Sequence, residues 1–257
     1  MEKLKILIAM HKQYIFPLQR YYFPIGVGRA LGNNIFLNIS GDDTGDNISL
    51  KNSSFCELTA LYWAWKNNFF KECLYVGLVH YRRYFKGKEI KLSNKRIASD
   101  NEILDYLKHS DCIVPKKRNY YIETIYEHYK HAHNIVDLDV TACILKEKYP
   151  DYMESFYTIM NSKELYLYNM FVMKKELFEQ YCKWVFDVLF ELEIRIDITK
   201  YDNYQKRVFG FIAERLFNVW LLKNNIIVKE ISIINIEKER TFLKVVNFIK
   251  RKFLCGK

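Results

Sequence analysis

Short apolar runs alternate with longer amphipathic segments along the chain. Residues 5–9, 73–79 and 111–114 are predicted to be buried strands, because a parallel strand covered on both faces is a nearly continuous apolar run. A helix is predicted to begin near Ser54, where Ser54 and Glu57 fit a capping box. Strands separated by helices indicate an α/β fold with a largely parallel sheet that has room for an antiparallel member.

The second half of the chain shows more helical periodicity. Residues 122–149 are predicted to be mostly helical, and residues 166–173 to form a strand. Two amphipathic helices follow, one around Trp184 and the other around Ile212. Residues 226–234 predict a late strand, which completes the α/β pattern.

The composition suits one folded domain, expected over residues 1–237, because 257 residues with 50% hydrophobic positions can bury a large core. The six cysteines are isolated and form no Cys-x-x-Cys pair, so we interpret them as reduced thiols, which favours the cytoplasm. The first residues do not fit a signal peptide, and no run of about 18 apolar residues predicts a spanning helix.

The formal net charge of +10 calls for an anionic partner or surface. The basic residues are spread along the chain without a nucleic-acid-binding motif, so a nucleotide diphosphate and an anionic membrane explain the charge better than nucleic acid. Residues 238–257 are predicted to form a basic amphipathic tail that can lie in a membrane interface or dock on the domain. We expect a peripheral protein on the inner face of the cell membrane.

Polar side chains follow two predicted strands at their carboxyl ends, where ligands bind in open α/β sheets. His11 and Lys12 follow the first strand, and His80, Arg82 and Arg83 follow the second. The planar, permanently charged guanidinium suits phosphate oxygens, so both arginines are candidates for stabilising a departing diphosphate. The alternative is that one arginine pairs with a buried carboxylate and the other lies on the surface.

The segment Asp42-Asp-Thr-Gly-Asp-Asn-Ile-Ser49 gathers carboxylates and amides around a glycine, just before a predicted helix. Its candidate ligand-binding residues are Asp42, Asp43, Asp46 and Asn47. They would recognise a base or ribose, or hold a cation. The alternative is a solvated turn, since Asp, Gly and Asn dominate turns.

Arg207, Gly210, Glu214 and Asn218 form one polar stripe on a predicted helix. A carboxylate beside the sheet can act as a general base on an acceptor hydroxyl, which makes Glu214 a catalytic candidate. The alternative is a salt-bridged helix surface.

Two further patterns invite a metal-binding interpretation. The spacing of His128, His131 and His133 cannot place three imidazoles on one helix face. Asp137-Leu-Asp139 follows a helical stretch and does not end a buried strand. We predict no metal site at either place.

Several segments together resemble the DUF4422 family of bacterial capsular and exopolysaccharide biosynthesis proteins, over about residues 4–225. The pieces that carry the resemblance are Ala9-Met-His-Lys12, residues 42–49, residues 55–67, Tyr75-Val-Gly-Leu-Val-His-Tyr-Arg-Arg-Tyr-Phe85, Tyr168-Asn-Met-Phe-Val-Met173 and residues 210–220. The resemblance implies a GT-A-like glycosyltransferase with a mostly parallel central sheet flanked by helices. It also implies a nucleotide-sugar donor and a polysaccharide or glycolipid acceptor.

The residues and the resemblance combine into one hypothesis. His11, Lys12, Asp42, Asp43, Asp46, Asn47 and His80 would bind the donor, a UDP-linked hexose such as galactose. Arg82 and Arg83 would hold the diphosphate without a metal, and Glu214 would be the base. If the enzyme depends on Mg²⁺ or Mn²⁺, the three aspartates would bind it. The acceptor would be a lipid-linked oligosaccharide.

Two other classes of function remain open. A non-catalytic partner of a polysaccharide assembly complex would keep working without His80, Arg82 and Glu214. A basic nucleic-acid binder would show affinity that falls steeply with salt.

Overall fold

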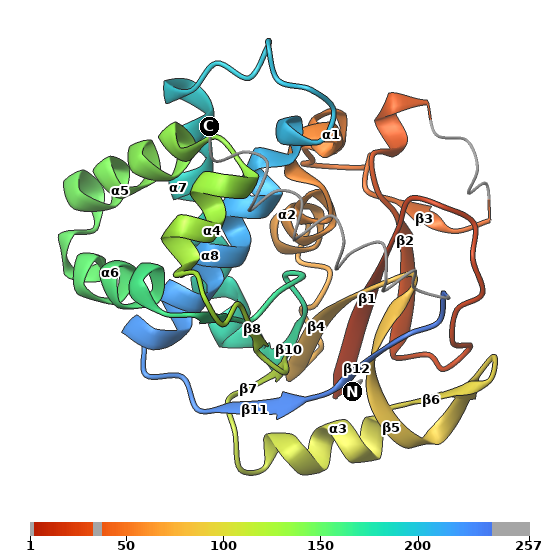
Figure 1. Ribbon diagram of the computed structural model, residues 1–257. Coiled ribbons are helices and arrows are strands. Elements are labelled where there is room, and N and C mark those ends of the chain that lie inside the picture. The colour runs from red at the N-terminus through yellow and green to blue at the C-terminus, as the bar shows by residue number, and fades with distance from the viewer. Residues whose placement is uncertain (1–2, 33–37, 238–257) are drawn as a thin grey trace.

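A central β-sheet carries helices on both faces in the computed structural model, which describes residues 3–32 and 38–237 (Figure 1). The strands are β1 (Leu4–Met10), β2 (Tyr22–Gly26), β3 (Ser40–Gly41), β4 (Tyr75–His80), β5 (Arg83–Leu92), β6 (Lys95–Ile97), β7 (Cys112–Pro115), β8 (Arg118–Asn119), β9 (Glu164–Leu165), β10 (Phe171–Lys174), β11 (Val228–Ile231) and β12 (Ile233–Asn235). The α-helices are α1 (Asn52–Phe55), α2 (Leu58–Lys66), α3 (Asp100–Leu107), α4 (Ile125–Ala132), α5 (Ile135–Lys148), α6 (Met153–Asn161), α7 (Lys175–Arg195) and α8 (Val208–Lys223).

The strand order is β11-β7-β10-β4-β1-β2-β3. Strand β10 is antiparallel to both of its neighbours, and the other adjacent pairs along this path are parallel. This confirms the predicted α/β architecture with a mostly parallel sheet. Strand β5 turns back from β4 and pairs with β6 and β12 beside the main sheet.

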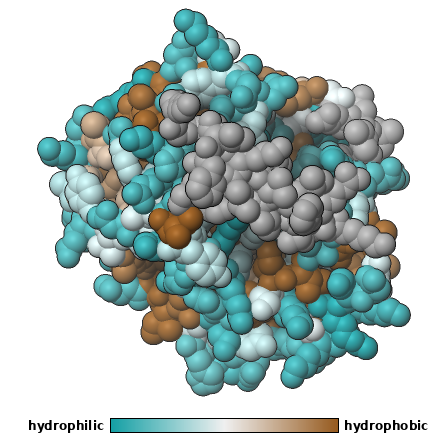
Figure 2. All heavy atoms as spheres, in the orientation of Figure 1, coloured by the Kyte–Doolittle hydropathy of each residue, from teal (hydrophilic) through white to brown (hydrophobic). Residues whose placement is uncertain are grey.

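Alternation along each strand sends side chains into two separate cores. Leu7 and Ala9 of β1 pack in the larger core, which α2 and α4 to α8 cover. Ile6 and Ile8 pack in the smaller core, with α3 and the β5–β6 ribbon. Burial on both faces explains why β1 reads as a continuous apolar run. Figure 2 shows mainly hydrophilic surface on the face drawn, with the apolar surface in separate patches.

Capping boxes fix the starts of two helices. The Ser99 hydroxyl accepts a bond from the Glu102 amide at the start of α3, and the Glu102 carboxylate accepts from the Ser99 amide. Thr124 and Glu127 do the same at the start of α4. Each such cap contributes about 1 kcal/mol.

The register aligns the carboxyl ends of the parallel strands at one edge. Ala9 of β1 pairs with His80 of β4, while Met10 pairs with Gly26 of β2, and Gly26 pairs with Gly41 of β3. Segments that follow these strands therefore leave the sheet side by side. The site is built at this edge.

Two local predictions were wrong. Ser54 and Glu57 do not form a capping box, because Cys56, with φ of 54°, ends α1 after Phe55 and Glu57 only precedes α2. The Ser54 hydroxyl instead donates to the Lys51 carbonyl oxygen. The strand predicted over residues 166–173 is interrupted, since its first half turns through two residues with positive φ before β10 begins.

No helix within residues 3–32 and 38–237 is long and apolar enough to cross a bilayer. The five cysteines in this part of the chain are free thiols. The predicted basic tail, residues 238–257, lies outside the described residues.

Candidate active site at the strand ends

Two histidines meet where β1 and β4 end. The His11 ring lies edge-on to the Tyr81 ring, with 4.7 Å between centroids. The Nε2 atom of His80 lies 2.6 Å from the backbone carbonyl oxygen of Tyr168, which comes from the segment between β9 and β10. An imidazole that donates Nε2–H to this oxygen keeps Nδ1 as an acceptor.

Burial favours the neutral form of the His80 imidazole more firmly than that of His11. His11 is exposed, so only the part of its ring that packs on Tyr81 is desolvated, and this desolvation, followed by the charge of Lys12, lowers its pKa below the ordinary value. Burial also lowers the pKa of His80 to about 4. The positive charges of Arg82 and Arg207 act on both rings, so cations from two distant segments converge here. At neutral pH the histidines therefore serve as hydrogen-bonding groups.

The paired arginines after β4 have different partners. The Arg82 guanidinium forms an ion pair with Glu237 at 3.0 Å, and both side chains are about one third exposed, so this carboxylate is not the buried partner of the alternative prediction. The Arg83 guanidinium lies over the Tyr168 ring, 4.4 Å from its centroid. Stacking on a ring fixes the plane of the guanidinium, which is what bidentate phosphate binding needs.

Two carboxyl groups lie on the helix side of the same region. Glu214 Oε1 accepts a bond of 2.7 Å from the Tyr168 amide, and Glu214 Oε2 pairs with Arg215 Nη1 at 3.2 Å. Glu57 Oε1 accepts a bond of 2.7 Å from Asn169 Nδ2. Burial is the main cause that raises the pKa of both carboxyl groups above the ordinary value.

The turn formed by Tyr168 and Asn169 links these groups. The backbone φ angles of these two residues are 76° and 50°, a conformation that residues other than glycine rarely adopt. The polar stripe of α8 holds the turn, because Gly210 accepts from Asn169, Glu214 accepts from Tyr168, and Asn218 bonds both backbone groups of Tyr166. The predicted polar stripe of α8 therefore holds the segment from Tyr166 to Asn169 in place through hydrogen bonds.

Asp42 lies at the same edge, but its carboxylate is fully engaged. It accepts bonds from the Gly28 and Arg29 amides at 3.0 and 3.2 Å and from the Ser49 hydroxyl, and the side chain is buried. Positive φ at Gly28, where a Cβ atom would lie 2.6 Å from an Asn52 oxygen, lets the loop close around this carboxylate. Asp42 therefore shapes the loop through Gly28 and Arg29 that follows β2.

The rest of the acidic segment faces α2. Asp46 accepts from the Tyr62 hydroxyl at 3.1 Å and lies 3.9 Å from the Lys66 ammonium. Asn47 closes a local turn through the Gly45 carbonyl and the Ser49 amide. Asp43 is exposed, as is Lys12 after β1.

The described residues contain no group of three His, Cys, Asp or Glu side chains that could hold a metal ion. Both carboxylate oxygens of Asp42 accept hydrogen bonds from the protein, and Asp46 lies near Lys66 of α2. Asp42 and Asp46 therefore do not fit a shared cation. His131 and His133 each contact a different partner, Glu123 and Gln205.

A family model described as a domain of unknown function, DUF4422, matches residues 5–225. The chain belongs to the DUF4422 family. Among solved structures, this DUF4422 chain is similar to the apo structure of WbbM, a bifunctional glycosyltransferase, with a TM-score of 0.82 and 33% sequence identity. The alignment covers 93% of this chain and 46% of that one, so this chain spans less than half of that protein. No curated protein matches.

This likeness confirms the predicted glycosyltransferase fold, in which a central sheet is flanked by helices. Three residues that the DUF4422 fold brings to the site were not predicted as site residues, which are Glu57, Asn169 and Arg207. The sequence pattern placed Glu57 in a helix cap and Arg207 on the polar stripe. A polar residue inside an apolar strand pattern, at Asn169, was the available signal for the turn.

Proposed function

We propose that this DUF4422 protein transfers a hexose from a nucleotide-diphosphate donor, UDP-linked, to a growing capsular, exo- or lipopolysaccharide acceptor. The observation that carries the proposal is the convergence of Arg82, Arg83 and Arg207 on His80 at the end of β4, where Arg82 and Arg207 also act on His11. A departing nucleoside diphosphate is an anion whose charge grows in the transition state, and fixed cations at that position stabilise it.

The proposed roles follow from the contacts. Arg83, stacked on Tyr168, and Arg207 bind diphosphate oxygens. His11 and His80 add neutral hydrogen-bonding groups, and the loop closed by Asp42 presents backbone to the nucleotide. One of the two carboxyl groups at the Tyr168–Asn169 turn is the base: Glu214, which the sequence predicted, or Glu57, which the fold brings to the same turn.

The proposed acceptor is a lipid-linked oligosaccharide at the inner face of the cell membrane. The net charge of +10 suits an anionic surface as well as an anionic donor. We also propose that no metal is needed, because cations of the chain already occupy the strand-end position.

A thermal-shift screen tests the proposal. The purified protein is heated with UDP, GDP, CMP and dTDP nucleotides, each in EDTA and in Mn²⁺. Binding to the native state raises the midpoint by mass action. We expect a shift with UDP that survives EDTA. A shift only in Mn²⁺ would contradict the metal-free arrangement, and no shift with any nucleotide would favour a non-catalytic partner of a polysaccharide assembly complex.

A further inference from the structure

Glu57 occupies a strained break between two helices. Cys56 adopts φ of 54° and ψ of −134°, a conformation that L residues rarely tolerate, and this break separates α1 from α2. Gly210 of α8 packs against the break so closely that a Cβ atom there would lie 3.1 Å from Cys56 Sγ. From this break the Glu57 side chain reaches Asn169 of the Tyr168–Asn169 turn.

The two carboxyl groups at this turn differ in how they are held. Each oxygen of Glu214 has a protein partner, the Tyr168 amide on one and the buried Arg215 guanidinium on the other. Glu57 accepts a side-chain hydrogen bond from Asn169 and a bond from its own backbone amide, and no ion pair within the described residues includes it. Glu214 is therefore held by a charged partner as a structural group, whereas Glu57 has only neutral partners and keeps capacity to accept a proton.

Asn169 adds an observation that points to a ligand. Its amide nitrogen donates to Glu57 and to the Gly210 carbonyl oxygen, at 2.7 and 3.3 Å. Its Oδ1 atom is buried and has no hydrogen-bond partner within the described residues, although the residue is only 3% exposed. Buried acceptors are almost always paired, so an orphaned one beside a carboxylate calls for a donor. A sugar hydroxyl bound beside Glu57 is such a donor.

The surroundings also suit proton transfer. Burial is the largest cause that raises the pKa of Glu57, while the bonds from Asn169 and from its own backbone amide, and then the positive charges of Arg207 and Arg83, oppose that rise. A carboxyl group whose pKa is moved toward neutrality is a better base in its ionised form. Arg83 and Arg207 are also the cations proposed to bind the diphosphate, so Glu57 lies close to where the sugar would be transferred.

We infer that Glu57, held by Asn169, is the catalytic base that removes the proton from the acceptor hydroxyl. This inference rests on the proposed function. As the acceptor oxygen forms its bond to the anomeric carbon, the proton passes to the Glu57 carboxylate. The bond between that carbon and the diphosphate oxygen breaks, and its electron pair leaves with the nucleoside diphosphate, whose charge Arg83 and Arg207 stabilise. Protonated Glu57 then returns its proton to solvent. Asn169 is a positioning residue.

The test compares Glu57→Gln with Glu214→Gln, a matched control that makes the same change in the other carboxyl group of the turn. UDP-galactose is the donor, water is the acceptor, and UDP release is measured from pH 4.5 to 9. We expect Glu57→Gln to lower kcat by roughly 10²–10⁴-fold. It should still show the UDP-induced thermal shift. The acid limb of the wild-type kcat profile should disappear in Glu57→Gln and remain in Glu214→Gln.

Two further variants keep the test decisive if Glu57→Gln does not fold. Glu57→Asp retains a base at a shorter reach, so we expect a lower rate with the acid limb preserved. Asn169→Ala should move that limb to higher pH, because it removes a hydrogen bond that stabilises the Glu57 carboxylate. The inference is overturned if Glu57→Gln keeps a third or more of wild-type kcat, or if the acid limb disappears in Glu214→Gln instead. Wild-type protein that neither binds UDP nor releases it would instead contradict the proposed function.

Discussion

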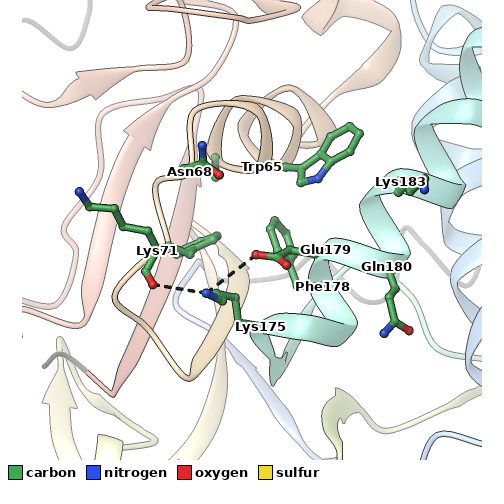
Figure 3. Close-up of a pocket in the computed structure, with 10 residues that line it drawn as sticks. Trp65, Asn68, Lys71, Lys175, Phe178, Glu179, Gln180 and Lys183 are labelled. Atoms are coloured by element: carbon green, nitrogen blue, oxygen red, sulfur yellow. Dashed lines mark hydrogen bonds and ion pairs between the residues drawn. The ribbon is translucent and has the colours of Figure 1, made fainter.

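The two edges of the sheet both carry cations and aromatic rings, but they hold them differently. At the edge where β4 begins, a cavity of about 440 Å³ is bordered by Trp65 of α2 and by Lys71, Lys175 and Lys183. Figure 3 shows Lys175 between the Lys71 backbone and Glu179, with Lys183 farther along α7. At the edge where β4 ends, the cations are arginines near histidines and buried acids.

The difference is one of preorganisation. Lys175 and Glu179 are 4.0 Å apart one helical turn from each other, an exposed arrangement worth a few tenths of a kcal/mol. Arg83 instead stacks on the ring of Tyr168, and the backbone of Tyr168 is held in a strained turn. Strain and shifted pKa values mark a site that the rest of the fold must support. The cavity lined by Lys71, Lys175 and Lys183 shows no strained backbone among these lysines.

Replacement of Arg83 by Ala should give the largest effect. The variant loses a fixed cation at the diphosphate and the stacking partner of Tyr168, so we expect kcat/KM to fall by about 10²–10³-fold. Steady-state release of UDP from UDP-galactose measures this. Arg83→Lys is the control, and it should recover only part of the loss because an ammonium lacks the planar fork. Full activity of Arg83→Ala would place the diphosphate elsewhere.

Replacement of His80 by Gln should change how stability depends on pH. Because the pKa of His80 is lowered to about 4, the unfolded state binds a proton between pH 6.5 and 4 that the native state does not. Wild-type stability therefore loses up to about 3 kcal/mol from this group as pH falls through that window. Urea unfolding at several pH values should show a smaller loss in His80→Gln, since Gln does not titrate. An unchanged slope would mean that His80 is protonated in the native state.

Replacement of Asp42 by Asn should reduce stability more than activity. The buried Asp42 carboxylate accepts hydrogen bonds from two backbone amides and one hydroxyl group. The Asn side chain has only one oxygen, so its NH₂ group would face at least one of these donors and that hydrogen bond would be lost. We expect a loss of about 2 kcal/mol in the free energy of unfolding, measured by urea denaturation. Asp46→Asn is the exposed control and should change stability by less than about 0.5 kcal/mol. Equal losses would contradict the assignment of Asp42 to loop closure.

The sequence was sufficient for the sheet and for part of the site, for a physical reason. Apolar runs such as residues 5–9 report burial on both faces, and His11, His80 and Arg82 follow strand ends directly. Glu57 and Asn169 could not be placed, because their roles depend on a contact across 112 positions of sequence and on positive φ angles at residues that are not glycine. Local propensity favoured a cap and a strand there, and tertiary packing against α8 overrode both.

Replacement of Lys183 by Ala should give the smallest effect and is the most direct check on the contrast between the two edges. Lys183 lines the cavity of Figure 3 and lies on α7, away from the strand ends. Because the Lys183 side chain is exposed to solvent, we expect its loss to change the free energy of UDP binding and of activation by less than about 0.5 kcal/mol. The UDP-induced thermal shift and kcat should therefore stay close to those of the wild type. Loss of the shift in Lys183→Ala together with its retention in Arg83→Ala would reverse the comparison. The anion would then bind where the sheet begins, and the strained turn would need another explanation.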